Sequence, residues 1–230
     1  MNQHTCTRRL EALKELMVQQ DMTDLLVTHP ANRFYLSGFE LYDGQCNESS
    51  GCLLVRTDGP DWLLTDARFT EEARRHWSGA HVHVYGAPRL EKIAGFLKKL
   101  GVKQLWVETQ AMCAEMYLGL EKELDLHPAP KLVEELRMVK DTAELAALRE
   151  SCHLNHSVYA VLERSVAPGM TERDVAWLLE REFRQNGAET LSFAPIVGFG
   201  PNAALPHATP GQTRLEPETP VRLVDRKSVV

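Results

Sequence analysis

The chain has 230 residues, a formal net charge of −6 and 43% hydrophobic residues, which suffices for a sizeable buried core and favours two compact domains. The acidic balance argues against a nucleic-acid partner, because no basic stripe is present to gather phosphates. No apolar run approaches the ~20 residues that span a bilayer, and the N-terminus lacks the apolar core of a secretory signal. These features predict a cytoplasmic protein with no membrane partner.

The five cysteines are scattered and odd in number, and no CxxC pair occurs; they are Cys6, Cys46, Cys52, Cys113 and Cys152. This pattern predicts reduced thiols rather than a disulfide framework, as is usual in the cytoplasm. Their contexts in the sequence do not single out one of them as a nucleophile.

Residues 1–132 alternate between helical and strand patterns. Leu10, Leu13 and Met17 share one face of a helix over residues 7–20, for which Thr7 is a plausible N-cap. The following expected elements are a buried strand ending at Pro30, a hairpin turning at Asp58-Gly59, and then helices 68–77, 89–101 and 114–124 with strands 81–86 and 104–108 between them. The alternation predicts an α/β N-terminal domain, with a mixed sheet flanked by helices.

Residues 127–132 contain two prolines that interrupt this alternation, so we place the domain boundary near residue 132. A long helix is expected over 141–166, with Asp141 as N-cap and Glu144 completing a capping box. A second helix begins after Thr171 and ends at Asn186-Gly187, and strands follow within 192–200 and 220–225. The pattern of residues 133–230 predicts an incomplete α+β domain.

Two histidine pairs have spacings that could suit metal binding. His81 and His83 share one face of a predicted strand, and His153 and His156 are three residues apart on a predicted helix. Neither pair has a third ligand nearby in the sequence, and no HExxH pattern occurs. A solvated strand face and an ordinary helix surface therefore remain the simpler interpretations. The segment 198–207 contains glycines, but it lacks the GxGxxG order of a phosphate-binding loop.

His207 stands in the segment NAALPHATPG, residues 202–211, between two prolines that fix φ and stiffen the loop. An imidazole held on a stiff loop offers one hydrogen bond in a fixed direction, which suits proton transfer or stabilisation of a developing charge. A loop histidine bonded to the backbone is the alternative that spacing alone leaves open.

Five segments, taken in order, carry a family resemblance that extends from about residue 8 to residue 225. They resemble motifs of the metallopeptidase family of Xaa-Pro dipeptidases (prolidases), aminopeptidases P and creatinases, whose catalytic half has the pita-bread fold. The segments are NRFYLSGF (32–39), LLTDARFTEEA (63–73), LVEELRMVKDTAEL (132–145), PGMTERDVAWLLE (168–180) and GFGPNAALPHATP (198–210).

The resemblance implies a creatinase-like N-terminal domain over residues 1–132 and the opening part of a pita-bread domain over 133–230. It also implies hydrolysis of the bond before proline in short peptides, by two divalent cations (Mn²⁺, Co²⁺ or Zn²⁺) held by Asp, Asp, His, Glu and Glu. His207 matches the family's substrate-binding histidine, which stabilises the tetrahedral intermediate. Asp225, at the end of VRLVD, matches the first metal ligand. A creatine-like substrate is an alternative within the same family.

The resemblance ends after Asp225, where RKSVV follows and the other four ligands have no counterpart in the sequence. We therefore expect the 230-residue chain to bind metal poorly and to be inactive by itself. The alternative is a non-catalytic scaffold for dimerisation or for binding peptides or proteins. Many relatives form homodimers through the N-terminal domain. The aromatic stretch NRFYLSGFELY (32–42) would suit such an interface.

Overall fold

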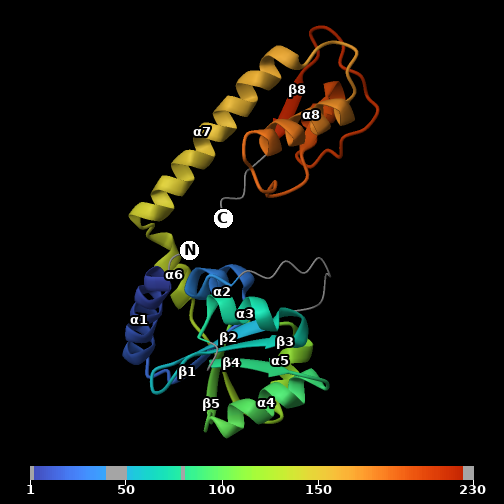
Figure 1. Ribbon diagram of the computed structural model, residues 1–230. Coiled ribbons are helices and arrows are strands. Elements are labelled where there is room, and N and C mark those ends of the chain that lie inside the picture. Colours follow the sequence, from blue (N-terminus) through green and yellow to red (C-terminus); the bar gives the residue numbers. More distant parts are fainter. Residues whose placement is uncertain (1–2, 40–50, 79–80, 225–230) are drawn as a thin grey trace. The chain divides into compact units, whose positions relative to one another are not determined.

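The computed structural model describes residues 3–39, 51–78 and 81–224 (Figure 1). The chain divides into two compact units, Met1–Val139 and Lys140–Val230. This division comes after the boundary expected at residue 132, because Leu132 and Val133 are buried in the core of the first unit. Within the described part of the chain, no helix combines the length and the apolar character that a membrane span requires.

The first unit is built on a mixed sheet whose described strands run in the order β4-β3-β2-β1-β5-β6. Its strands are β1 (Asp24–Val27), β2 (Gly51–Arg56), β3 (Trp62–Asp66), β4 (Val82–Tyr85), β5 (Gln104–Val107) and β6 (Asp125–Pro128). Its helices are α1 (Gln3–Gln19), α2 (Pro30–Ser37), α3 (Thr70–His76), α4 (Arg89–Lys99), α5 (Ala114–Glu121) and α6 (Leu132–Met138). The β1–β2 and β2–β3 pairs are antiparallel, and the β1–β5, β3–β4 and β5–β6 pairs are parallel. The predicted mixed sheet flanked by helices is confirmed.

Helices cover both faces of this sheet, so its central strands are apolar on both sides. Leu26, Leu54 and Leu64 point to one face, where they pack with side chains of α4 and α5. The neighbouring residues along each strand point to the other face, where α1, α2, α3 and α6 contribute to a second core; they are Leu25, Val27, Leu53, Val55 and Leu63. The period of two along each strand thus divides one apolar run between two cores.

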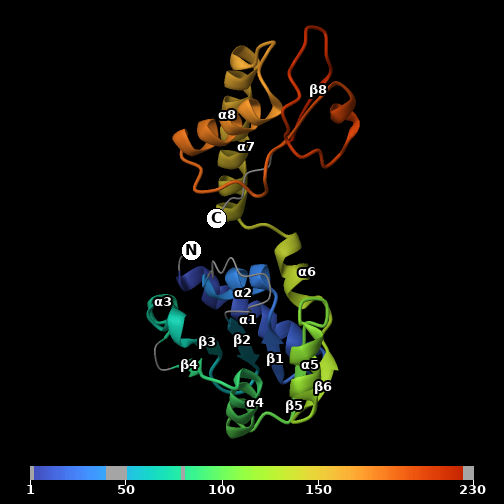
Figure 2. The same cartoon turned by 90° about the vertical axis from the view of Figure 1, so that its right-hand side faces the viewer.

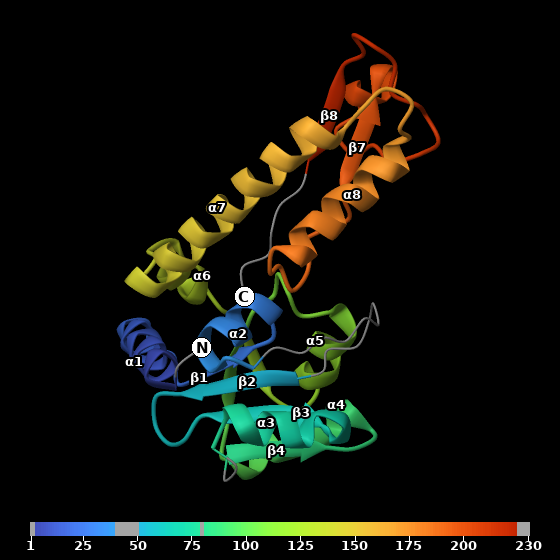
Figure 3. The ribbon, with the colours of Figure 1, turned by 45° about the horizontal axis from the view of Figure 1, so that its top comes forward.

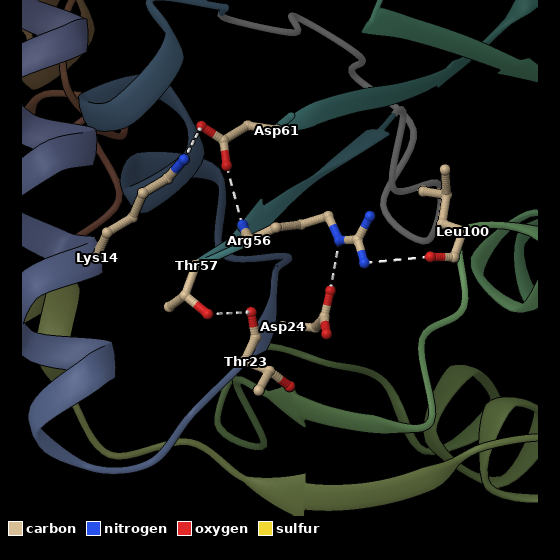
Figure 4. A network of polar contacts seen from close by, with 7 residues as sticks. All are labelled: Lys14, Thr23, Asp24, Arg56, Thr57, Asp61 and Leu100. Carbon is tan, nitrogen blue, oxygen red and sulfur yellow. Dashed lines mark hydrogen bonds and ion pairs between the residues drawn. The ribbon is translucent and has the colours of Figure 1, made fainter. Parts of the chain in front are cut away.

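A polar network closes the end of the β2–β3 hairpin (Figure 4). The Nε atom of Arg56 donates to Asp24 Oδ1 at 2.7 Å, and its guanidinium also reaches the carbonyl oxygen of Leu100 at 3.2 Å. Asp61 accepts from the Arg56 backbone N–H at 2.9 Å and pairs with Lys14 Nζ of α1 at 2.9 Å. One arginine and one aspartate therefore tie the hairpin to β1, to the end of α4 and to α1.

Glu108 is a second polar centre of the first unit. It directly follows β5 in the sequence, and its side chain contacts the residues at the start of α2. Its Oε2 accepts from the backbone N–H groups of Thr28 at 2.6 Å and His29 at 2.7 Å. Its Oε1 accepts from Asn32 Nδ2 at 2.6 Å. Burial raises the pKa of the Glu108 carboxyl above its usual value, although these three hydrogen bonds oppose the shift. The carboxylate satisfies backbone donors that the helix itself leaves without partners.

One local expectation for the first unit was wrong. Thr7 is not an N-cap, because α1 begins at Gln3 and the Thr7 hydroxyl donates to the Gln3 carbonyl oxygen at 3.1 Å. In the aromatic stretch that would suit an interface, Phe34 and Tyr35 are half-buried. Phe39 is fully buried, and Arg9 lies 3.9 Å from the Tyr35 ring centroid. Residues 40–42 of that stretch lie outside the described residues, and dimerisation stays a prediction.

The second unit consists of two helices and a small sheet within the described residues. Its elements are α7 (Thr142–Ser165), α8 (Glu172–Gln185), β7 (Ile196–Phe199), the 3-10 helix Gly200–Ala204 and β8 (Val221–Val224). α8 packs against α7 (Figure 2) and also against β7, which pairs antiparallel with β8 (Figure 3). The core residues include Val158, Leu162, Leu179 and Phe183. This is the α+β arrangement expected from the sequence.

Both helices of the second unit begin with the capping boxes that the sequence predicts. Asp141 accepts from the Glu144 backbone N–H at 2.9 Å, and the Glu144 side chain accepts from the Asp141 N–H at 2.9 Å. Thr171 and Asp174 exchange the same pair of bonds at the start of α8. Each capping box therefore satisfies two N-terminal donors through residues three positions apart.

Candidate functional site: the histidine loop

The loop that carries His207 connects β7 to β8. It begins with the 3-10 helix Gly200–Ala204, and His207 lies in the turn that follows, with an exposed side chain. The next residue, Ala208, is buried and fixes the chain beside it. Among the described residues, none forms a hydrogen bond or ion pair with the His207 ring. The imidazole is thus exposed on a short, anchored turn, and it is available to a ligand.

Glu172, the first residue of α8, holds this loop at both ends. It is 1% exposed, and its Oε1 accepts from the Phe199 backbone N–H and from Asn202 Nδ2, both at 2.9 Å. Its Oε2 accepts from the backbone N–H of Gly211 at 2.8 Å. One carboxylate therefore joins the entry and the exit of the segment in which His207 lies.

Further hydrogen bonds fix the loop to β8, to the residue before β8 and to Thr213. Arg222 Nε donates to the Ala203 carbonyl oxygen at 2.6 Å, and the Gly200 N–H donates to the Pro220 carbonyl oxygen at 2.9 Å. Asn202 Nδ2 also donates to Thr213 Oγ1 at 3.2 Å. The stiffness expected from the prolines thus has a second source in side-chain anchors.

The electrostatics of Glu172 follow from this arrangement. Burial acts to raise the pKa of its carboxyl, but the hydrogen bonds from Asn202, Phe199 and Gly211 outweigh it and lower the pKa below the usual glutamate value. The charged form is thus the one that the site stabilises. Its position in the first turn of α8 also favours a negative charge, because the N-terminal end of the helix dipole is positive.

Gly198 provides a test of how closely the loop packs on β7. A Cβ atom at this position would lie 2.6 Å from the Asn202 carbonyl oxygen, so the Gly198→Ala variant must displace the loop. We expect it to destabilise the second unit by about 1–3 kcal/mol, measured by urea unfolding. The control is Gly95→Ala in α4, where a Cβ meets no atom within 4 Å and the better helix propensity of alanine should not destabilise the chain. Equal stabilities for Gly198→Ala and the unmodified chain would contradict this packing.

The resemblance assigns one metal ligand to this chain, Asp225. It directly follows β8 but lies outside the described residues, so its side chain is not placed. No group of three or more His, Cys, Asp or Glu side chains that could hold a metal ion occurs in the described part of the chain. The residues described therefore do not by themselves fit the two-cation site that the family resemblance implies.

The structure places the other candidate histidines and cysteines as follows: two histidines pack on aromatic rings, and two are exposed on a helix. His81 packs edge-on against Trp62 with ring centroids 5.0 Å apart, and His83 stacks on Phe96 at 3.7 Å. His153 and His156 are exposed on α7. Four cysteines are free thiols, namely Cys6, Cys52, Cys113 and Cys152, whereas Cys46 lies outside the described residues. Burial raises the pKa of Cys52 to about 12, so its thiol is unreactive at neutral pH.

Comparison with known proteins gives the family. The chain matches the Creatinase/Prolidase N-terminal domain over residues 9–139, which is more than half of its length, and metallopeptidase family M24 over residues 146–224. The chain therefore belongs to the creatinase/prolidase family of metallopeptidases.

Individual relatives agree with this assignment. The uncharacterized peptidase YqhT of Bacillus subtilis is 28% identical over 211 residues, which are 90% of this chain and 58% of that protein. An Xaa-Pro dipeptidase structure from Bacillus anthracis has a TM-score of 0.83 at 24% identity, covering 96% of this chain and 61% of the other. A recombinant prolidase from Thermococcus sibiricus has a TM-score of 0.84 at 22% identity, covering 97% and 62%. The structural likenesses show a shared fold, and the chain spans somewhat under two thirds of each of these relatives.

Sequence reasoning singled out His207 but missed the residues that hold its loop. In the sequence, Glu172 lies within the segment 168–180 and Asn202 within the segment 198–210, and nothing in either segment distinguishes them. The residues that donate to Glu172 lie 27–39 positions away in the sequence, so no local spacing could reveal these contacts. The one available signal was a glutamate next to the capping pair Thr171 and Asp174, which already satisfied the helix end.

Proposed function

We propose that this chain forms the N-terminal unit and the substrate-binding loop of a metallopeptidase that cleaves the bond before proline in short peptides. The observation that carries the proposal is the anchored His207 loop, in a chain whose family is one of metallopeptidases. The structures from Bacillus anthracis and Thermococcus sibiricus are titled as an Xaa-Pro dipeptidase and a prolidase, which supports this substrate class.

His207 would bind the peptide and stabilise the oxyanion that develops at the scissile carbonyl. An imidazole suits this role because it can donate a hydrogen bond in a direction that the anchored loop fixes. In the complete site, Asp225 would be the first of five ligands for two divalent cations (Mn²⁺, Co²⁺ or Zn²⁺), which would supply an activated water. Free thiols in the described residues support a cytoplasmic location. The proposed enzyme is a homodimer.

The 230-residue chain by itself is expected to show no hydrolysis of Leu-Pro or Ala-Pro with excess Mn²⁺ or Co²⁺. One matching ligand cannot replace five, because each cation must exchange much of its hydration shell for protein groups. The measurement is proline release after repurification, with the Asp225→Ala variant as control. Turnover by the unmodified chain that disappears in the variant would overturn this expectation.

The gene sequence beyond codon 230 tests the proposed activity. A frame that continues is expected to encode a second Asp, a His and two Glu, and its product should cleave Leu-Pro. The His207→Ala variant of that product should lose about 10²–10³ in kcat, as enzymes do when one oxyanion donor is removed. A continuing frame without these ligands would instead favour a non-catalytic scaffold for dimerisation or peptide binding.

A further inference from the structure

The Glu172 side chain has no role in capping its own helix. Thr171 and Asp174 already form the capping box of α8, in which Asp174 Oδ2 accepts from the Thr171 N–H at 2.8 Å. The backbone N–H of Glu172 is bonded to the Thr213 carbonyl oxygen at 3.1 Å. The buried Glu172 carboxylate is therefore free to bind groups outside the helix. The three donors that it binds all belong to the histidine loop or to β7, the strand that leads into it.

The geometry of these bonds closes the loop. Phe199 and Asn202 are bound by Oε1 at the beginning, and Gly211 is bound by Oε2 at the end, so His207 lies within the closed segment. Only a carboxylate presents two oxygens that both accept and neither donates. Burial strengthens the arrangement, because a donor left without a partner in this site would lose its hydrogen bond and gain no water in exchange.

We propose that Glu172 is the positioning residue of His207: its carboxylate fixes both ends of the loop and thereby the direction of the imidazole. The inference rests on the proposed function only for what His207 does once it is held in place. Glu172 touches neither substrate nor reacting atoms, and it acts solely through the loop.

The variant that tests this is Glu172→Gln, which keeps the shape and replaces one acceptor oxygen with an NH₂ donor. In either orientation the amide can serve only one end of the loop, and at the other end donor faces donor. In the ¹⁵N-labelled 230-residue chain, we expect amide hydrogen exchange at Phe199 or Gly211 to accelerate about tenfold or more. The His207 ring resonances should shift and show increased fast motion, while those of His153 and His156 on α7 stay unchanged.

The matched control is Glu180→Gln, the same substitution on the same helix. Glu180 is partly exposed and pairs with Arg184 at 3.0 Å, away from the loop. We expect its His207 resonances and its exchange rates at Phe199 and Gly211 to equal those of the unmodified chain. Asn202→Ala is a second test that leaves the carboxylate in place and removes one of its donors. It should shift the His207 resonances even if Glu172→Gln unfolds the unit.

Unchanged His207 resonances in Glu172→Gln, or in Asn202→Ala should the first variant unfold, would overturn the positioning role. Titration with Ala-Pro separates this outcome from a failure of the proposed function. If the unmodified chain shows no His207 response to the dipeptide while Glu172→Gln still mobilises the ring, the substrate role fails and the positioning role stands. A response to Ala-Pro that weakens in Glu172→Gln, but not in Glu180→Gln, supports both.

Discussion

The Phe183→Ala variant is expected to lose about 3–5 kcal/mol of the free energy of unfolding of the second unit. Phe183 is fully buried in α8 and packs in a cluster with Val158, Leu162 and Leu179. Truncation removes the transfer free energy of the ring and leaves a cavity that two packed helices can fill only in part. Because a small unit has limited stability, such a loss takes away most of its margin.

Amide hydrogen exchange at increasing urea concentration measures this effect unit by unit. We expect α8 amides to lose protection in Phe183→Ala, while those of β1 in the first unit keep theirs. Trp177→Ala is the matched control, because Trp177 lies on the same helix but is 64% exposed. Its expected change is within about 0.5 kcal/mol. A loss of protection in the control as large as in Phe183→Ala would contradict the assignment of the effect to the burial of Phe183, because alanine has the better helix propensity in both variants.

The Glu108→Ala variant is expected to destabilise the first unit by about 3 kcal/mol or more. Its carboxylate accepts from the N–H groups of Thr28 and His29 and from Asn32 Nδ2. Truncation leaves the N–H groups of Thr28 and His29 without their partner, whereas Asn32 Nδ2 keeps a second acceptor in Glu134 Oε1 at 2.9 Å. Each buried donor without a partner costs about 1–3 kcal/mol. The start of α2 and the end of β5 would both loosen, since Glu108 is the side chain that joins them.

Urea unfolding followed by the fluorescence of the first unit's tryptophans measures the change. The control is Glu121→Ala at the end of α5, where the glutamate is exposed and the expected change is within about 0.5 kcal/mol. The stability of Glu108→Gln should fall between those of Glu108→Ala and the unmodified chain. The amide keeps one acceptor oxygen, which can serve at most two of the three donors. A Glu108→Ala chain as stable as the control would mean that these donors find other partners.

Features with local causes were predictable from the sequence. The capping pairs at Asp141 and Thr171 depend on residues three positions apart, and the Asp58-Gly59 turn requires only the positive φ that Gly59 adopts. The alternation of strands and helices in the first unit follows from apolar periodicity for the same reason. Each of these features is decided within one short window of the chain.

Features with distant causes were not predictable in this way. The two prolines within residues 127–132 predict an interruption of the alternation of strands and helices. The structure instead continues it with β6, which ends at Pro128 on the edge of the sheet, where a missing N–H costs little. α6 was not among the elements expected from the sequence, because its helix gains stability from burying Leu132 and Val133 in a core built by other elements. The anchors of the His207 loop depend on Glu172 contacts that only the folded chain creates.

The pairing of β1 has a consequence for the order of folding during synthesis. Leu26 pairs with Leu54 of β2 on one side and with Val107 of β5 on the other, so the two neighbours of this strand emerge from the ribosome far apart in time. The antiparallel half of the sheet can form first, because its contacts are closer in sequence. Until β5 is made, β1 is an open edge whose backbone groups could pair with another chain. Nascent chains of this protein are therefore most exposed to misassociation in the interval between the synthesis of β2 and that of β5.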